Sequence, residues 1–305
     1  MEVDSPVFIV TIYRTGSTLL RNILDRSRFV AMAPEELHLW NPYPWRQDAV
    51  TLCKKFGKIR EKKKLEKLVE VLFSKKLYGA FWKKIDRYGI SKDRVLSRAS
   101  QILKQSGEVS CMDVVNLVLL DYLERTDKPI FGGKNPVYAT NIEFLENHYP
   151  DCKVLLLFRD PRAVYLSKTN DEFSRWLKGR LPRPLHHVYD FITLLRVSIE
   201  YRWLYRTCVK NRHRDNVRVV KYEDLLSNPV PMLKAVCRFI GVPFESGMLY
   251  TTGKESSIEN VRRRGIDSRG AHLWRKRIKP WECMLIDALL GDVMSDLGYG
   301  KCRTC

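Results

Sequence analysis

The sequence predicts an α/β protein with three layers, α/β/α, in which helices cover both faces of a central parallel sheet. Four short and almost continuously apolar segments are the predicted strands: residues 6–12, 129–131, 153–158 and 217–221. Each is followed by a turn and a helical pattern, which is typical of parallel strands that are buried on both faces. A long, mostly helical stretch, residues 48–126, separates the first two strands. We therefore expect one domain over residues 1–305 that contains a helical insertion.

The first predicted strand leads directly into an anion-binding turn, Arg14-Thr15-Gly16-Ser17-Thr18, and then into a helix. Backbone N–H groups in the first turn of a helix have no partner within the helix and lie at the positive end of its dipole. Gly16 permits close approach of the backbone, and Arg14 adds a charge-assisted fork. Ser17 and Thr18 add hydroxyl donors. The segment is P-loop-like but lacks the Gly-Lys-Ser/Thr ending of nucleotide triphosphatases, so we expect an anion site that works without magnesium.

A second anion site is predicted at the end of the third strand. The strand ends at Phe158, Arg159 follows it, and Asp160-Pro161 suits the first turn of a new helix. Ser167 lies two turns further on, so it can converge with Arg159 at the carboxyl edge of the sheet, where parallel sheets bind ligands. Two such sites imply a ligand with two separated anionic groups. The alternative for Arg159 is a structural role, capping the helix or pairing with Asp160.

The chain is strongly basic. Fifty-four Lys and Arg against thirty-five Asp and Glu give a formal net charge of +19 and a pI near 9.6, which favours acidic ligands. The basic run at 54–67 is interpreted as a solvated face. A nucleic-acid-binding protein would use the same charge, but the sequence shows no RNP-like pattern, zinc-finger spacing or helix-turn-helix signal. A P-loop kinase is disfavoured by the missing Gly-Lys-Ser/Thr.

Cysteines and targeting signals bear on the compartment. Eight cysteines are scattered without a framework, so we expect reduced thiols. Cys302 and Cys305 have C-x-x-C spacing without a second pair, so a frayed tail, or a disulfide in a secreted chain, is favoured over zinc or redox chemistry. No apolar stretch approaches the roughly 18 residues of a membrane span, and no signal-peptide pattern precedes the first strand. We expect a cytoplasmic protein, with the Golgi lumen as the alternative if an N-terminal anchor has been removed.

These motifs resemble those of the sulfotransferases that use 3′-phosphoadenosine 5′-phosphosulfate (PAPS). The loop from Arg14 resembles the family's P-R-S-G-[ST]-T-L-L loop for the 5′-phosphosulfate, with Tyr13 in place of proline and Thr15 in place of serine. Arg159, with Ser167 eight residues later, resembles the family's 3′-phosphate motif in residue type and spacing. The resemblance implies a nucleotide site that contains both segments.

Two later segments resemble elements of the same family. Residues 219–225 resemble its third common segment, whose tyrosine, here Tyr222, lies near the nucleotide. The basic stretch 254–279 contains Ser268-Arg269-Gly270, which resembles a late loop over the nucleotide 3′-phosphate; the alternatives are recognition of an acidic acceptor and a solvated face. The similarity is greatest to the group that includes tyrosylprotein, bacterial and polyketide-associated sulfotransferases.

The resemblance implies in-line transfer of a sulfuryl group from PAPS to a hydroxyl. This reaction needs a base, cations for the transferring oxygens and a donor for the bridging oxygen of the leaving group. Glu35 and Glu36 are level candidates for the base, with His38 as a partner or rival. Lys134 matches the family's Lys-x-Pro and would reach the bridging oxygen, while Arg14 would neutralise the nonbridging oxygens. No metal is required by this scheme. The alternatives are a solvated charged loop and, for Lys134, an exposed residue at a helix start.

The acceptor is the part of the reaction for which the sequence has no motif. A small-molecule or carbohydrate alcohol is preferred, an acidic one being compatible with the basic surface, and peptide tyrosine is second. Four aromatic residues can stack on a ring or sugar face, or belong to the core: Trp40, Tyr43, Trp45 and Trp82. A family member that binds without catalysing is a further alternative, which the joint presence of the candidate catalytic and nucleotide-binding residues disfavours.

Overall fold

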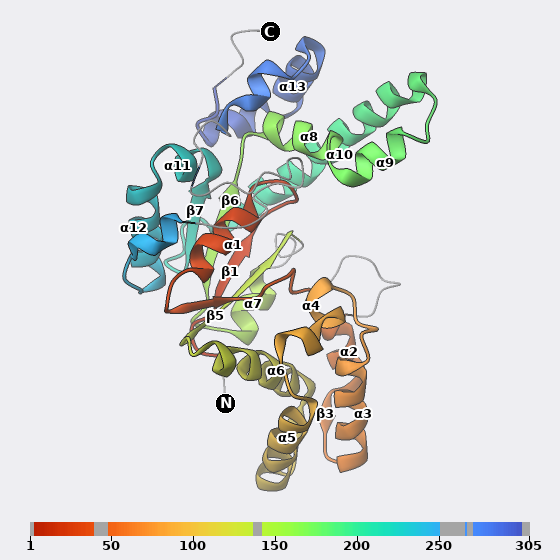
Figure 1. Cartoon of the computed structure of the whole chain (residues 1–305), viewed down its shortest axis with the longest axis vertical. Coiled ribbons are helices and arrows are strands. Elements are labelled where there is room, and N and C mark those ends of the chain that lie inside the picture. The colour runs from red at the N-terminus through yellow and green to blue at the C-terminus, as the bar shows by residue number, and fades with distance from the viewer. Residues whose placement is uncertain (1–2, 40–47, 137–141, 251–265, 267–270, 301–305) are drawn as a thin grey trace. The chain divides into compact units, whose positions relative to one another are not determined.

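A computed structural model of the chain describes residues 3–39, 48–136, 142–250, 266 and 271–300 (Figure 1). It contains a central parallel sheet flanked by helices, as the sequence predicts. The strand order is β2-β5-β1-β6-β7. The strands are β1 (Val7–Val10), β2 (Val30–Met32), β5 (Ile130–Asn135), β6 (Lys153–Phe158) and β7 (Val217–Lys221). The α/β prediction is confirmed.

Apolar side chains on both faces hold the central strands. All four residues of β1 and residues 154–158 of β6 are completely buried, which explains their continuous apolar sequence. β6 pairs in parallel with β7, from Val154 opposite Val217 to Phe158 opposite Lys221. β2 pairs in parallel with β5, from Val30 opposite Ile130 to Met32 opposite Gly132.

Two strands differ from the sequence prediction. β2 was not predicted, because three residues are too few to show a periodic pattern. β5 extends to Asn135, whereas the expected strand ended at 131. Gly132 and Gly133 lie inside the strand, where the absence of a side chain lets Met32 and Phe8 approach: a Cβ at Gly132 would lie 2.1 Å from the Met32 sulfur.

The chain forms two compact units. Met1–Phe8, Ser27–Val137 and Glu143–Lys153 belong to the first, and Ile9–Arg26, Tyr138–Ile142 and Val154–Cys305 belong to the second. That the whole chain acts as one domain remains a prediction.

The stretch 48–126 of the first unit is helical, as expected, apart from a short antiparallel ribbon of β3 (Lys58–Ile59) and β4 (Val109–Ser110). Its helices are α2 (Ala49–Phe56), α3 (Lys62–Phe73), α4 (Ala80–Lys83), α5 (Lys92–Ser106) and α6 (Cys111–Thr126). α3 packs on α5, and α2 and α5 pack on α6. The lysines of the basic run are exposed, as expected of a solvated face. Those in α3 lie on the solvated side of an amphipathic helix whose Leu65, Leu68 and Leu72 are buried. α7 (Ile142–His148) follows β5.

Polar caps set the ends of these insertion helices. Asp48 accepts a hydrogen bond from the Thr51 N–H at the start of α2. Ser110 and Asp113 form a capping box at the start of α6. Gly107 closes α5 in the left-handed conformation that glycine adopts at little cost.

The helices of the second unit flank β6 and β7 in the sequence. They are α1 (Ser17–Asp25), α8 (Pro161–Thr169), α9 (Glu172–Lys178), α10 (Arg183–Asn211), α11 (Tyr222–Ser227), α12 (Pro229–Ile240) and α13 (Pro280–Asp296). α10 packs on both α8 and α13. The described helices include none that is both long enough and apolar enough to span a bilayer.

Six cysteines lie within the described residues, and the structure records none of them in a disulfide: Cys53, Cys111, Cys152, Cys208, Cys237 and Cys283. Cys302 and Cys305 lie outside the described residues.

A buried ion pair ties α8 to the chain's C-terminal part. The Arg162 guanidinium donates to both carboxylate oxygens of Asp160, at 2.9 and 2.8 Å, and to the Gly300 carbonyl at 2.9 Å. It also lies 4.3 Å from the centre of the Trp274 ring. Asp160 in turn accepts from the Arg162 backbone N–H and caps α8. The carboxylate of Asp160 thus pairs with Arg162, and not with Arg159 as the structural alternative held.

Replacing Arg162 by alanine should strongly destabilise the protein, since it would leave the buried Asp160 carboxylate without its ion partner. We expect a loss of about 3–5 kcal/mol in the free energy of unfolding, measured by urea denaturation. Arg98→Ala is the matched control, because Arg98 makes a two-bond pair with Glu124 on the exposed surface and should cost about 1 kcal/mol or less. Equal losses in the two variants would contradict a stabilising role for the buried pair.

Candidate functional site

The predicted site residues within the described chain fall into two groups, one in each unit. The second unit holds Arg14, Thr15, Gly16, Ser17, Thr18, Arg159, Ser167 and Tyr222, and the first holds Glu35, Glu36, His38 and Lys134. Ser268, Arg269 and Gly270 lie outside the described residues, as do Trp40, Tyr43 and Trp45.

The loop between β1 and α1 has the backbone geometry of an anion cradle. Arg14 and Gly16 have φ angles of +75° and +91°, and Gly16 is the residue that precedes α1. Left-handed residues in such a turn direct backbone N–H groups into a shared concavity. Among the described residues, no side chain caps the first turn of α1. The N–H groups of Ser17 and Thr18 therefore remain suited to a ligand, as the sequence predicts.

Threonine hydroxyls hold this loop in place. The Thr11 hydroxyl donates to the Leu157 carbonyl of β6 at 2.8 Å, and the Thr15 hydroxyl donates to the Ile12 carbonyl at 3.1 Å. Thr11 and Thr15 are completely buried and contact each other through their hydroxyls. The Thr15 side chain is thus part of the scaffold, and its contribution to a ligand is limited to its backbone.

Tyr222 closes one side of the loop. It follows β7 as the first residue of α11, and its ring lies directly against Gly16. A Cβ at Gly16 would lie only 2.3 Å from ring carbons Cδ2 and Cε2 of Tyr222. Glycine is therefore required here for two reasons, the left-handed backbone and the space that the ring occupies.

Arg159 joins the loop to the second predicted motif. Its guanidinium lies 4.5 Å from the centre of the Tyr222 ring and donates through Nη1 to the Arg14 carbonyl at 3.1 Å. Its backbone carbonyl accepts from the Tyr201 hydroxyl at 2.9 Å. Within the described residues, Nε of Arg159 is buried and has no hydrogen-bond partner. A buried donor of this kind is costly unless a ligand satisfies it.

Ser167 contacts Arg14. The Arg14 Nε donates to the Ser167 hydroxyl at 2.9 Å, and Ser167 is almost completely buried in α8. Arg14 therefore contacts both residues of the second motif, Ser167 through its side chain and Arg159 through its carbonyl. The structure brings the two predicted anion motifs together through this one residue.

Lys168 is a further cation beside the loop that the sequence analysis did not select. Its ammonium lies 4.9 Å from the centre of the Tyr13 ring. Burial, and then repulsion by Arg196 and Arg14, lower its pKa, with partial opposition from Glu200 and Asp171. Burial also lowers the pKa of Arg14, which Asp171 opposes and Arg159 reinforces. The sequence feature that could have pointed to Lys168 is its position next to Ser167 in α8. An anion bound here would offset this surplus of positive charge.

In the first unit, the loop after β2 runs beside the end of β5. The Ala33 N–H donates to the Gly132 carbonyl at 2.7 Å, and the Leu37 N–H donates to the Lys134 carbonyl at 3.3 Å. The Asn135 side chain donates to the Leu37 carbonyl at 3.1 Å. These bonds fix the backbone that carries Glu35, Glu36 and His38.

The two adjacent carboxylates have different partners. Glu36 accepts from the Lys134 ammonium at 3.2 Å, and its other oxygen lies 3.5 Å from Nε2 of His38. Glu35 instead pairs with Lys84, which follows α4. Glu36, Lys134 and His38 form one cluster, and Glu35 is paired with a lysine that has no place in the predicted scheme.

Lys134 and His38 are held in the interior. Lys134 is 7% exposed and lies within β5, so the alternative of an exposed lysine at a helix start is wrong. The His38 ring packs against Tyr78 at a centroid distance of 4.5 Å, and Gly79 leaves room for it. Trp82 donates to the His38 carbonyl and is completely buried. Trp82 is therefore a core residue and is not available to stack on an acceptor.

Comparison with known proteins finds relatives of this chain. The nodulation protein NoeE of Sinorhizobium fredii (strain NBRC 101917 / NGR234) is 21% identical over 310 residues, and the match covers 96% of this chain and 65% of that protein. The chain thus spans less than two thirds of that relative's length.

Two solved structures share the fold. The sulfotransferase domain from the curacin biosynthetic pathway has a TM-score of 0.59 and 19% identity, covering 98% of this chain and 99% of that one. The sulfotransferase domain from the Synechococcus PCC 7002 olefin synthase has a TM-score of 0.52 and 20% identity, with 95% of both chains covered.

The family model described as "Sulfotransferase family" matches residues 6–246, a range that includes every described candidate site residue. The chain belongs to the sulfotransferase family.

Proposed function

We propose that this protein is an enzyme that transfers the sulfuryl group of PAPS to a hydroxyl of a small-molecule or carbohydrate acceptor. The observation that carries the proposal is the cluster of Arg14, Arg159 and Tyr222 around an uncapped helix start, with a buried donor on Arg159 that has no described partner. Family membership supports sulfuryl transfer as the reaction class.

The cluster suits a nucleotide with two anionic groups. The N–H groups at the start of α1 suit the 5′-phosphosulfate, since a tetrahedral anion is stabilised there by the backbone and the helix dipole. The Arg159 guanidinium and the Ser167 hydroxyl suit the 3′-phosphate. Arg14 contacts both residues and adds a positive charge, which favours an anionic ligand over a neutral one.

The first unit supplies the groups for proton transfer. In the proposed reaction, Glu36 accepts the proton of the acceptor hydroxyl as the acceptor oxygen bonds to sulfur. The bond between sulfur and the bridging oxygen breaks, and adenosine 3′,5′-bisphosphate leaves. Lys134 donates a hydrogen bond to the oxygen that gains charge. The Lys134 ammonium lies 3.2 Å from the Glu36 carboxylate, so the proposed base and the proposed hydrogen-bond donor belong to one cluster.

Peptide tyrosine is the second candidate acceptor, because its phenol also presents an O–H to a base. A P-loop kinase and a nucleic-acid-binding protein are more remote alternatives that share the basic charge. We expect the reaction to need no metal. The nucleotide that the protein prefers distinguishes a sulfotransferase from a kinase. Binding of adenosine 3′,5′-bisphosphate that survives a chelator supports the proposal, and a preference for ATP with magnesium would support the kinase.

Replacing Arg159 by alanine should weaken the binding of adenosine 3′,5′-bisphosphate, because it removes a charge-assisted contact worth about 1.5–3 kcal/mol. Calorimetric titration at moderate salt measures the change, since salt screens nonspecific attraction to the basic surface. Arg98→Ala removes the same charge from an exposed site of the first unit and should leave affinity unchanged. The 3′-phosphate role of Arg159 fails if both variants bind as tightly as the wild type.

Replacing Gly16 by alanine should abolish binding of the bisphosphate for two reasons. The new Cβ would collide with the Tyr222 ring, and alanine would have to adopt the left-handed backbone conformation of Gly16. Gly107→Ala is the matched control: Gly107 has a φ of +75° with nothing within 4 Å of its Cβ position. It should lower stability by about 1 kcal/mol and leave binding intact. Wild-type affinity in Gly16→Ala would exclude this loop from the nucleotide site.

The variants Glu36→Gln and Glu35→Gln test which carboxylate is the base. We expect Glu36→Gln to lower kcat by about 100- to 10,000-fold with nucleotide affinity unchanged, while Glu35→Gln keeps most activity. The assay follows formation of the bisphosphate with a panel of alcohol, sugar and tyrosine acceptors. Full activity in Glu36→Gln removes it as the base, and a loss confined to Glu35→Gln would reverse the assignment.

A further inference from the structure

Helix α10 is apolar on two opposite faces, and one of them is exposed. Its buried face includes Leu194, Val197, Tyr201 and Leu204, which pack within the second unit. The opposite face carries six side chains that are exposed to solvent: Leu185, Val188, Ile192, Leu195, Ile199 and Trp203. We call these six residues the α10 stripe. Ile192, Ile199 and Trp203 are 58%, 55% and 53% exposed.

The α10 stripe is continuous. Its residues recur at intervals of three or four, so they lie on one side of the helix over roughly 27 Å. An isolated exposed leucine needs no explanation, but a row of six large apolar side chains on a surface marks an interaction site.

Helices α9 and α10 follow each other in the chain and form a helical hairpin, and α9 carries two exposed aromatic residues. Phe173 and Trp176 are 64% and 51% exposed, and their rings stack at a centroid distance of 5.9 Å. They share a short helix whose position is fixed, so their exposure is a feature of the fold.

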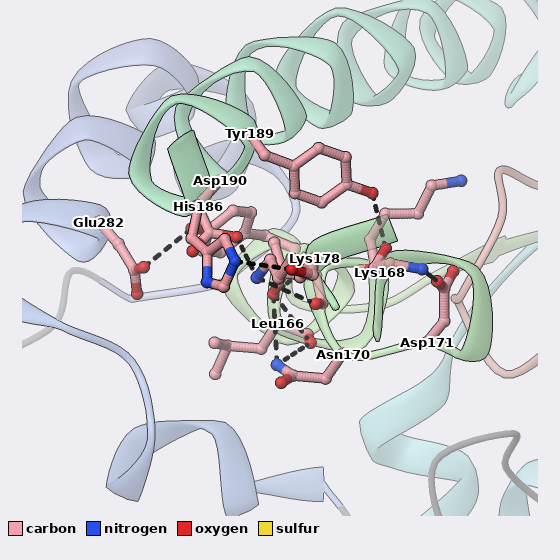
Figure 2. Close-up of polar contacts among 12 residues, drawn as sticks. Leu166, Lys168, Asn170, Asp171, Lys178, His186, Tyr189, Asp190 and Glu282 are labelled. Carbon is pink, nitrogen blue, oxygen red and sulfur yellow. Dashed lines mark hydrogen bonds and ion pairs between the residues drawn. The ribbon is translucent and has the colours of Figure 1, made fainter. Parts of the chain in front are cut away.

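Polar contacts fix α9 against the first turns of α10 (Figure 2). The Ser174 and Tyr189 hydroxyls lie 2.7 Å apart, Lys178 pairs with Asp190, and His186 Nε2 lies 2.7 Å from the Lys178 carbonyl. Figure 1 shows the two helices side by side. These hydrogen-bonding groups join the two helices, whereas the rings of Phe173 and Trp176 are exposed to solvent.

The hairpin is basic at both ends of the stripe. Residues 172–212 contain nine Lys and Arg and three Asp and Glu, and two of the arginines, Arg202 and Arg212, pair with Asp292 and Asp296 of α13. Two of the acidic residues, Asp190 and Glu200, are paired with Lys178 and Arg196. Arg180 lies over the Trp176 ring at 4.0 Å near the start of the stripe, and Arg206 and Lys210 follow its end.

This charge pattern selects the kind of partner. A second copy packed in parallel would place each arginine beside its own equivalent, and an antiparallel copy would place Arg206 near Arg180 or Arg183. Both arrangements bring like charges together on a chain of formal charge +19. An anionic surface meets no such repulsion.

We propose that the α9–α10 hairpin docks on an anionic lipid bilayer. The α10 stripe, with Phe173 and Trp176, would enter the boundary between headgroups and acyl chains, as amphipathic interfacial helices do. The flanking arginines and lysines would bind the anionic headgroups, each contributing to an attraction that salt screens. The proposal is independent of the proposed function.

Flotation with lipid vesicles tests the proposal. The wild type should bind vesicles of phosphatidylcholine mixed with phosphatidylserine, and bind vesicles of phosphatidylcholine at least about tenfold more weakly. The double variant Ile192→Ser/Ile199→Ser should lose at least about tenfold in affinity for the anionic vesicles. Arg180→Gln/Arg183→Gln should lower the affinity for the anionic vesicles and leave the weak binding to neutral ones unchanged.

Met284→Ser is the matched control, because Met284 is 62% exposed on α13, outside the hairpin, and its loss should leave vesicle binding unchanged. Binding of adenosine 3′,5′-bisphosphate and the urea midpoint verify that each variant folds. Equal binding of the wild type to both vesicles, or no binding to either, overturns the proposal. A wild-type dimer in sedimentation that Ile192→Ser/Ile199→Ser dissociates would assign the surface to a second copy instead.

Discussion

Three cations lie around the loop that precedes α1, and their placement constrains the packing of the second unit. Arg14, Arg159 and Lys168 are held there by a scaffold that allows them little freedom: Thr11 fixes the loop to β6, Tyr222 fills the space beside Gly16, and Tyr201 holds the Arg159 backbone. Burial of like charges is costly, and it lowers the pKa of both Arg14 and Lys168. An anion bound by this cluster would offset that cost, which is why we propose an anionic ligand for this unit.

The sequence predicted the parts of the fold in which pattern and environment agree. β1 and β6 are continuous apolar runs because they are buried on both faces, and the Arg14 loop and α8 begin where their turn residues indicate. β2 and the end of β5 were not predicted, because each forms a strand only by pairing with the other. The three residues of β2 pair with β5 because Gly132 has no side chain and lets Met32 approach. Pairing of this kind is a tertiary property and leaves no periodic signal in either segment.

The site shows the same division. Spacing was enough to select Arg14, Arg159 and Lys134 as candidates. It could not separate Glu35 from Glu36, because neighbouring residues in a loop point in directions that the sequence does not encode. The separation comes from their partners, Lys84 on one side and Lys134 with His38 on the other. The α10 stripe was hidden for a related reason. A helix that is apolar on two faces has no clear periodicity, so one face can be recognised as exposed only when the other is seen to be packed.

The basic charge of the chain serves the two proposed sites in different ways. Around Arg14 the cations are half-buried, so water and salt weaken their attraction for an anion less than on an open surface, and geometry helps to decide which anion binds. On the α9–α10 hairpin the cations are spread over an exposed surface, where screening is strong and geometry imprecise, which suits a fluid layer of headgroups. The same net charge of +19 therefore supports selective binding where it is concentrated and half-buried, and broad attraction where it is dispersed. The degree of burial, and not the number of lysines and arginines, distinguishes the proposed nucleotide site from the proposed membrane-facing surface in this chain.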